Sequence, residues 1–185
     1  MTIALKTRMT AVQFLRKYGD KSGFELDRGH LVRLPMPGFE HGNITCTVSA
    51  LLREFVKAKD IGRVASQDTF IRLRSNPSSF RGPDVLFISY KLLPKSAKRP
   101  KGPLEVMPEL VIEVRSPTDR LKVVTDKGRE YLDAGVKVVI IIDPETESLG
   151  VFRDEELPQR FHNGDTVTIP DVLPGFSAPV KAFFE

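Results

Sequence analysis

The stretch from residue 110 to residue 142 constrains the fold more than any other part of the chain. Residues 110–114 form a short apolar run, which is typical of a buried strand. Residues 121–134 then place apolar side chains near one side of a helix, and Gly135 suits its C-terminal end. Residues 136–142 are continuously apolar, which predicts a central strand covered on both faces. We therefore expect a strand–helix–strand crossover.

Further elements are predicted on both sides of this unit. Apolar spacing predicts helices over residues 9–18, with Thr10 as the cap, and over residues 40–59. We expect a hairpin over 24–34, a turn over 76–79, a loop over 92–108, and strands over 62–65, 69–73, 85–89, 149–153 and within 161–169. No internal repeat and no long linker divides the chain. The prediction is one mixed α/β (α+β) domain over residues 1–185.

Composition limits where such a chain can reside. Of its 185 residues, 41% are hydrophobic and 28% are charged, which fits a soluble globular protein. No apolar run approaches ~20 residues, so no membrane span is expected, and the apolar patch of residues 1–8 is too short for a secretory signal. The one cysteine, Cys46, cannot form an internal disulfide, and we expect it to be a small core residue. Together these features predict a cytoplasmic protein.

One carboxylate, Glu113, lies within the first apolar run of the crossover unit. Burying a carboxylate costs several kcal/mol, roughly, unless a cation or hydrogen bonds compensate it. A metal ion or a lysine is therefore expected to face Glu113. Asp84 begins another predicted strand, and if the two strands are neighbours, both carboxylates can point to one place. Two hard oxygen ligands completed by water suit Mg²⁺ or Mn²⁺, and the scattered histidines give no zinc spacing.

Two basic residues compete for a third role beside this acid pair. Arg115 lies two residues after Glu113 and would share its face of a strand, but arginine holds its proton too firmly to act as a base. Lys127 lies on the following helix and could reach back over the strand end to assist an attacking water. We favour Lys127 for catalysis and assign Arg115 a phosphate or structural contact.

Basic residues also gather in a Pro-rich segment, although the net charge of the chain is only +4. Lys95, Lys98, Arg99 and Lys101 have no acid among them, which favours contact with the phosphates of a nucleic acid. An ordinary solvated loop would explain the same charges, so this feature alone leaves both interpretations open.

Several motifs in a shared order resemble the Uma2 family (DUF820), a branch of the PD-(D/E)XK nuclease-like superfamily. The resemblance covers nearly the whole chain, and each motif alone is weak. The matching segments are 9–15, 24–32, Glu40-His41, 82–85, 108–117, 126–131 with 134–136, 142–144 and 170–176. The resemblance implies a restriction endonuclease-like core, a mixed β-sheet flanked by helices, with an N-terminal helix and a β-hairpin.

The resemblance also implies roles for particular residues. It supports Asp84 and Glu113 as ligands of Mg²⁺ or Mn²⁺, and Lys127 as the catalytic lysine moved from the strand to the next helix. Glu25 matches an acidic family position that could complete the metal site. His41, Gln67 and Tyr131 are weaker matches in the same region, and Tyr131 also fits a plain core residue. The implied activity is metal-dependent endonucleolytic cleavage of DNA, and we expect a homodimer because cutting two strands needs two sites.

Two other interpretations remain open from the sequence. The chain could be a nuclease-fold module that binds nucleic acid or a protein partner without cutting. Alternatively, Glu113 could form a buried ion pair with Arg115 or Lys127 that serves stability alone. Glu25 could equally lie on the solvent face of its hairpin, and His41 could be a cap or surface residue.

Overall fold

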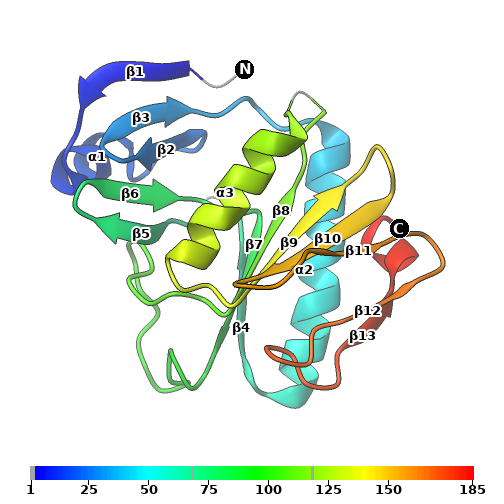
Figure 1. Cartoon of the computed structure of the whole chain (residues 1–185). Coiled ribbons are helices and arrows are strands. Elements are labelled where there is room, and N and C mark those ends of the chain that lie inside the picture. The colour runs from blue at the N-terminus through cyan, green and yellow to red at the C-terminus, as the bar shows by residue number, and fades with distance from the viewer. Residues whose placement is uncertain (1–2, 68, 118) are drawn as a thin grey trace.

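The computed structural model describes residues 3–67, 69–117 and 119–185 (Figure 1). The helices are α1 (Ala11–Tyr18), α2 (Phe39–Lys59), α3 (Leu121–Asp133) and the short 3₁₀ helix η1 (Val180–Phe183). The strands are β1 (Ile3–Arg8), β2 (Phe24–Asp27), β3 (His30–Arg33), β4 (Gly62–Ser66), β5 (Ile71–Ser75), β6 (Ser78–Arg81), β7 (Val85–Ser89), β8 (Leu110–Val114), β9 (Val138–Asp143), β10 (Ser148–Arg153), β11 (Gln159–Phe161), β12 (Thr166–Thr168) and β13 (Ser177–Pro179).

A six-stranded sheet in the order β11-β10-β9-β8-β7-β4 forms the centre of the molecule. Its pairs are antiparallel except β8 and β9, which run parallel with Glu113 opposite Ile141. Because α3 connects these two strands, the predicted crossover is confirmed. The prediction that the continuously apolar β9 is a central strand is also confirmed, since β9 lies inside the sheet and is covered on both faces.

The two faces of this sheet bury different helices. Along β8 and β9, alternate side chains pack with the Ile44, Val48, Leu52 and Val56 stripe of α2 on one face. The intervening side chains pack on the other face with α3, through Val124, Tyr131 and Leu132. This alternation is the ordinary consequence of the two-residue period of a strand. It directs Glu113, two residues after Val111, toward α3.

A second sheet, in the order β1-β3-β2-β6-β5, packs with α1 at one side of the first (Figure 1). The predicted N-terminal helix and hairpin are confirmed, and the Thr10 hydroxyl accepts a hydrogen bond from the N–H of Gln13 as the cap. The chain passes from β6 in this sheet to β7 in the other within three residues, 82–84. That junction brings β2 of the second sheet close to the start of β7.

Some local predictions differ from the structure. The expected turn over residues 76–79 is partly strand, because β6 begins at Ser78 and its alternation is hidden by polar residues. The strand expected over 69–73 lies at Ile71–Ser75, and β1 was not predicted. Cys46 was expected in the core but is exposed, because the buried face of α2 follows a stripe of three- and four-residue steps that passes through Ile44 and Val48.

Candidate active site

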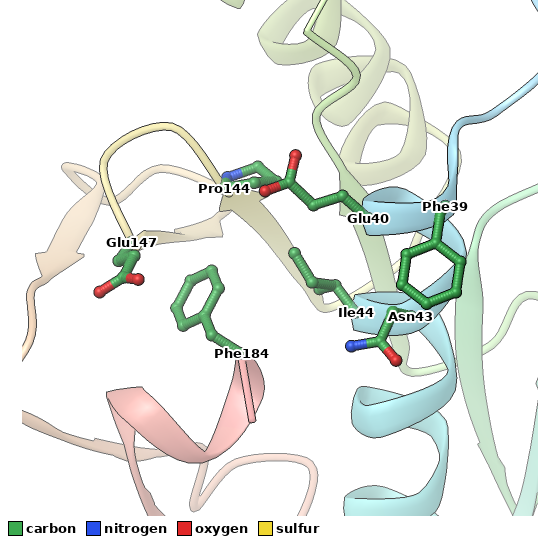
Figure 2. Close-up of a pocket in the computed structure, with 7 residues that line it drawn as sticks. All are labelled: Phe39, Glu40, Asn43, Ile44, Pro144, Glu147 and Phe184. Carbon is green, nitrogen blue, oxygen red and sulfur yellow. The ribbon is translucent and has the colours of Figure 1, made fainter.

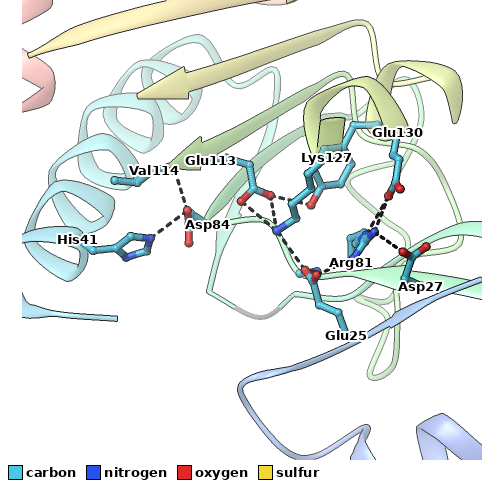
Figure 3. A network of polar contacts seen from close by, with 11 residues as sticks. Glu25, Asp27, His41, Arg81, Asp84, Glu113, Val114, Lys127 and Glu130 are labelled. Carbon is cyan, nitrogen blue, oxygen red and sulfur yellow. Dashed lines mark hydrogen bonds and ion pairs between the residues drawn. The ribbon is translucent and has the colours of Figure 1, made fainter. Parts of the chain in front are cut away.

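Asp84 and Glu113 lie at the same end of neighbouring strands. Val85 of β7 pairs with Ile112 of β8, so the residue before Val85 lies beside the residue after Ile112. The backbone N–H of Val114 donates a hydrogen bond to Oδ2 of Asp84 at 2.7 Å (Figure 3). This bond fixes the Asp84 carboxylate across the end of β8. The sequence argument that the two carboxylates could point to one place required neighbouring strands, and the structure provides them.

Glu113 is 6% exposed and is held from α3. The Nζ atom of Lys127 lies 2.9 Å from Oε1 and 3.0 Å from Oε2 of Glu113, and the Tyr131 hydroxyl donates to Oε1 at 2.7 Å. Lys127 and Tyr131 are four residues apart and therefore share one face of the helix. Burial raises the pKa of Glu113 to about 7; the charge of Lys127 opposes this rise, and the charges of Asp84 and Glu25 add to it.

Glu25 enters the same site from β2 and is also buried, at 1% exposure. Its Oε1 atom accepts the Gly82 N–H at 3.0 Å and lies 3.1 Å from Nζ of Lys127. Its Oε2 atom accepts from Arg81 at 3.0 Å. Burial alone would raise the pKa of Glu25, but the charges of Lys127 and Arg81 outweigh it and the pKa is lowered. The alternative that Glu25 lies on a solvent face of the hairpin is therefore excluded.

The site is a continuous network in which carboxylates outnumber cations (Figure 3). Arg81 links Glu25 to Glu130, 2.6 Å away, and to Asp27, 3.5 Å away. Two permanent cations thus serve five carboxylates: Glu25, Asp27, Asp84, Glu113 and Glu130. Burial acts to lower the pKa of Lys127, but the charges of Glu113 and Glu25 prevail and raise it. The imbalance favours a further positive charge beside Asp84 and Glu113.

His41 and Gln67 touch Asp84 in different ways. His41, in the first turn of α2, places Nε2 3.3 Å from Oδ2 of Asp84. The hydrogen bond to Asp84 raises the pKa of His41, although burial opposes that shift. Gln67 is exposed, and its backbone N–H donates to the Asp84 carbonyl at 3.0 Å. The structure therefore brings the His41 side chain into the site, whereas Gln67 contributes a backbone contact.

Arg115 and Lys95 bind carboxylates other than Asp84 and Glu113. The guanidinium of Arg115 bonds to Asp143, 3.0 Å away, and to Glu145. Lys95 pairs with Asp60 at the C-terminal end of α2, while His41 near the opposite end of that helix contacts Asp84. Nineteen residues of helix separate His41 from Asp60, or about 28 Å at 1.5 Å per residue. The segment from Lys95 to Lys101 is close to the site in sequence only.

A family model described as "Uma2: Putative restriction endonuclease" matches residues 11–181. The chain belongs to the Uma2 family. Five solved chains resemble the structure. One is a crystal structure at 1.96 Å resolution, from Anabaena variabilis ATCC 29413, titled as "a putative nuclease belonging to DUF820". It aligns with a TM-score of 0.80 and 20% identity over 95% of this chain and 97% of the other, and thus shows the shared fold. No curated protein matches this sequence.

A pocket of about 250 Å³ lies at the same end of the sheet but does not contain the acid pair (Figure 2). It is lined by the start of α2, the turn after β9 and the C-terminal Phe184. Glu40, next to His41, and Glu147 provide carboxylates to its wall. Two acids make this pocket a poor phosphate site. Asp84, Glu113 and Lys127 are not among the residues that line it.

The residues of this Uma2 site fit a divalent ion of the Mg²⁺ type. Within the described ranges 3–67, 69–117 and 119–185, no three His, Cys, Asp or Glu side chains already form a group that could hold a metal. Mg²⁺, however, is commonly bound through one or two carboxylates, with waters and substrate phosphates completing six oxygen ligands. Asp84 and Glu113 provide two adjacent carboxylates, and the excess of negative charge around them favours a cation.

Sequence reasoning missed the part played by Arg81. No role was predicted for Arg81, yet it is 8% exposed and connects β6 to β2 and α3. Its partners Glu25, Asp27 and Glu130 lie on β2 and α3, which are distant from Arg81 in sequence, so no local pattern reveals the contacts.

Among the described residues, no helix is long and apolar enough to cross a bilayer.

Proposed function

We propose that this single domain of residues 1–185 is a metal-dependent DNA endonuclease that hydrolyses phosphodiester bonds. Membership of the Uma2 family and the fold of the Anabaena protein support a nuclease function. The observation that carries the finer proposal is the meeting of Asp84, Glu113 and Lys127 at one end of β7 and β8. Two carboxylates that can hold a metal ion and a lysine that can stabilise developing charge are suited to hydrolysis of a phosphodiester.

In this proposal Asp84 and Glu113 hold Mg²⁺ or Mn²⁺. The ion would polarise a phosphoryl oxygen and lower the pKa of a bound water. Val114 orients Asp84 through its backbone N–H, and Tyr131 orients Glu113 through its hydroxyl. Both bonds restrict the side chains before substrate arrives. Such preorganisation is the main way in which a protein scaffold contributes to electrostatic stabilisation of a transition state.

Lys127 would neutralise charge that develops on the phosphate and position the attacking water. The raised pKa of Lys127 makes it a cation at neutral pH, which suits charge stabilisation better than proton abstraction. Arg115 is the weaker choice for this role, because Asp143 and Glu145 already occupy its guanidinium. One oxygen of Glu25 contacts Lys127 and the other contacts Arg81. We therefore propose that Glu25 positions these two cations, and we prefer this role to that of a third metal ligand.

His41 is proposed to position Asp84 from the start of α2. His41 contacts Asp84 at 3.3 Å from the first turn of α2, on the side of Asp84 away from Lys127 and α3 (Figure 3). We propose DNA as the substrate and the cytoplasm as the location. We also propose a homodimer, because each chain offers one such site and a duplex has two strands to cut.

A non-cleaving nuclease-fold module is the second candidate. It is favoured by one observation: both oxygens of Glu113 already have protein partners, in Lys127 and Tyr131. If those contacts serve only stability, Asp84 and Glu113 bind no ion and the chain recognises nucleic acid or a protein without cutting.

Cleavage of plasmid, single-stranded and branched DNA with Mg²⁺ or Mn²⁺ tests the proposal. The variants are Asp84→Ala and Lys127→Ala, and the control is Glu109→Gln, which changes a buried glutamate at the other end of β8 that contacts Ser89 instead. We expect a loss of about 10²–10⁴-fold in both variants and little change in the control. Equal cleavage by wild type and Asp84→Ala, or no cleavage of any DNA form, would contradict the proposal and favour the binding module.

A further inference from the structure

Positive charge is concentrated in two segments at the end of the molecule opposite Asp84 and Glu113. Residues 57–63 close α2 and lead into β4, and residues 91–101 follow β7. These segments hold eight Lys and Arg residues and one acid, Asp60, which is a net charge of +7. Because the whole chain carries +4, the remainder carries −3. The excess positive charge of this basic protein is therefore local.

The two segments are joined by specific contacts. The guanidinium of Arg63 donates to the carbonyls of Leu93, Pro94 and Lys95, at 2.7, 3.3 and 3.0 Å respectively, and stacks 5.0 Å from the Tyr90 ring. The Lys95 ammonium binds both oxygens of Asp60, at 2.6 and 2.7 Å. Arg63 and Lys95 thus fix the backbone of the loop against the end of α2. The remaining cations of the two segments lie in, or next along the chain to, the parts that these contacts join.

Six exposed cations remain on this surface, and none has an acidic partner among the residues that the structure describes. We call this set the basic pole: Lys57, Lys59, Lys91, Lys98, Arg99 and Lys101. Some cations elsewhere, such as Arg72, Arg115 and Arg153, pair with a carboxylate. Six exposed cations without an acidic partner in two joined segments create a local positive potential, which attracts a polyanion.

We propose that the basic pole is a second nucleic-acid contact, which binds the phosphate backbone away from the scissile bond. The choice of a nucleic acid over another polyanion rests on the proposed nuclease function. Asp60, beside the pole, lies about 28 Å from His41 along α2, which corresponds to about 8 base pairs of B-form duplex at 3.4 Å each. A longer duplex therefore has the length to span this distance. Because phosphate contacts carry no sequence information, the pole adds affinity without specificity.

The experiment measures binding of a fluorescent duplex of about 40 base pairs, without divalent metal, over a range of salt concentrations. The pole variant combines Lys98→Gln, Arg99→Gln and Lys101→Gln. We expect binding to weaken on the order of tenfold or more, and the slope of log K against log salt to fall in magnitude by about 2 to 3, since each lost phosphate contact removes about 0.9. In cleavage assays KM should rise while kcat stays unchanged.

The matched control removes the same charge from three exposed cations at the N-terminal side of the molecule: Arg16→Gln, Lys17→Gln and Lys21→Gln. It should bind as the wild type does. The pole variant should melt at the wild-type temperature, and the control slightly below it, because Lys17 and Lys21 each lie 5.5 Å from the centroid of the Tyr18 ring. Equal binding by the pole variant and the control would overturn the proposal. So would pole-dependent binding to phosphatidylserine vesicles by a protein that does not bind DNA. DNA binding that depends on the pole, without cleavage under any condition, would overturn the proposed nuclease function and leave the pole intact.

Discussion

Glu109 and Glu113 lie at the two ends of β8 and differ in what surrounds them. They are 7% and 6% exposed, so burial does not distinguish them. Glu109 accepts hydrogen bonds from the backbone N–H of Ser89, at 2.9 Å, and from the Ser89 hydroxyl, at 2.5 Å. Glu113 instead faces the Lys127 ammonium and the Tyr131 hydroxyl, with Asp84 and Glu25 nearby.

The two carboxylates therefore differ in their partners, and we propose a catalytic role for Glu113 alone. Glu109 is bound by donors of the adjacent strand and connects β7 to the start of β8. Glu113 shares its one cation with Glu25 and feels the charge of Asp84, and burial with those charges raises its pKa to about 7. Perturbed pKa values of this kind occur preferentially at functional sites. A second cation near Glu113 would stabilise its ionised form.

The largest effect is expected when Glu113 loses its cation. Lys127→Met leaves Glu113 buried without a positive partner, and removal of one member of a buried ion pair typically costs about 3–5 kcal/mol of unfolding free energy. We expect the lower end of that range, because protonation of Glu113 limits the loss. Urea denaturation at neutral pH measures it. Lys122→Met, on the same helix but exposed and paired with Asp126, should cost less than about 0.5 kcal/mol; equal losses in both variants would contradict the assigned role of Lys127.

An intermediate effect is expected from pH. A carboxyl whose pKa is about 7 in the folded state and 4.5 when unfolded binds its proton more tightly in the folded state. Its contribution to stability is therefore complete below pH 4.5 and is lost as pH rises to about 7, by up to about 3 kcal/mol. Glu113→Gln should remove this decline in urea denaturation, whereas Glu109→Gln should retain it. A decline of unchanged size in Glu113→Gln would show that another group titrates.

The smallest effect is expected at the other end of β8. Ser89→Ala removes one of the two donors to Glu109 and leaves the backbone N–H in place. Loss of a hydrogen bond to a buried charged group should lower the unfolding free energy by about 1.5–3 kcal/mol, toward the lower value because one donor remains. DNA cleavage should not change. A cleavage defect as large as that of Lys127→Ala would remove the distinction between the two glutamates.

The sequence was sufficient for most of the elements, but not for β1 or the start of β6, and it pointed to Glu113 and Lys127 as candidates. Glu113 was identified because a carboxylate inside an apolar strand needs a partner, and Lys127 because a helix returning over that strand can provide one. Glu25 needed the family resemblance, since a hairpin residue has two possible faces. Arg81 and Glu109 were not identified, because their partners Glu25, Glu130 and Ser89 are distant in sequence. The position of the basic segment also could not be predicted, because it depends on the direction of β7. Asp84 precedes the start of β7, whereas residues 91–101 follow its end, at the opposite edge of the sheet.

Calorimetric titration with Mn²⁺ in the absence of DNA tests the central claim most directly. The wild type, Asp84→Asn and Glu109→Gln would be compared at pH 8, where Glu113 is mostly ionised. We predict one saturable site in the wild type and in Glu109→Gln, weaker binding by the wild type at pH 6 because a proton competes at Glu113, and loss of the site in Asp84→Asn. Unchanged binding in Asp84→Asn, or none in the wild type, would contradict a metal centre at Asp84 and Glu113.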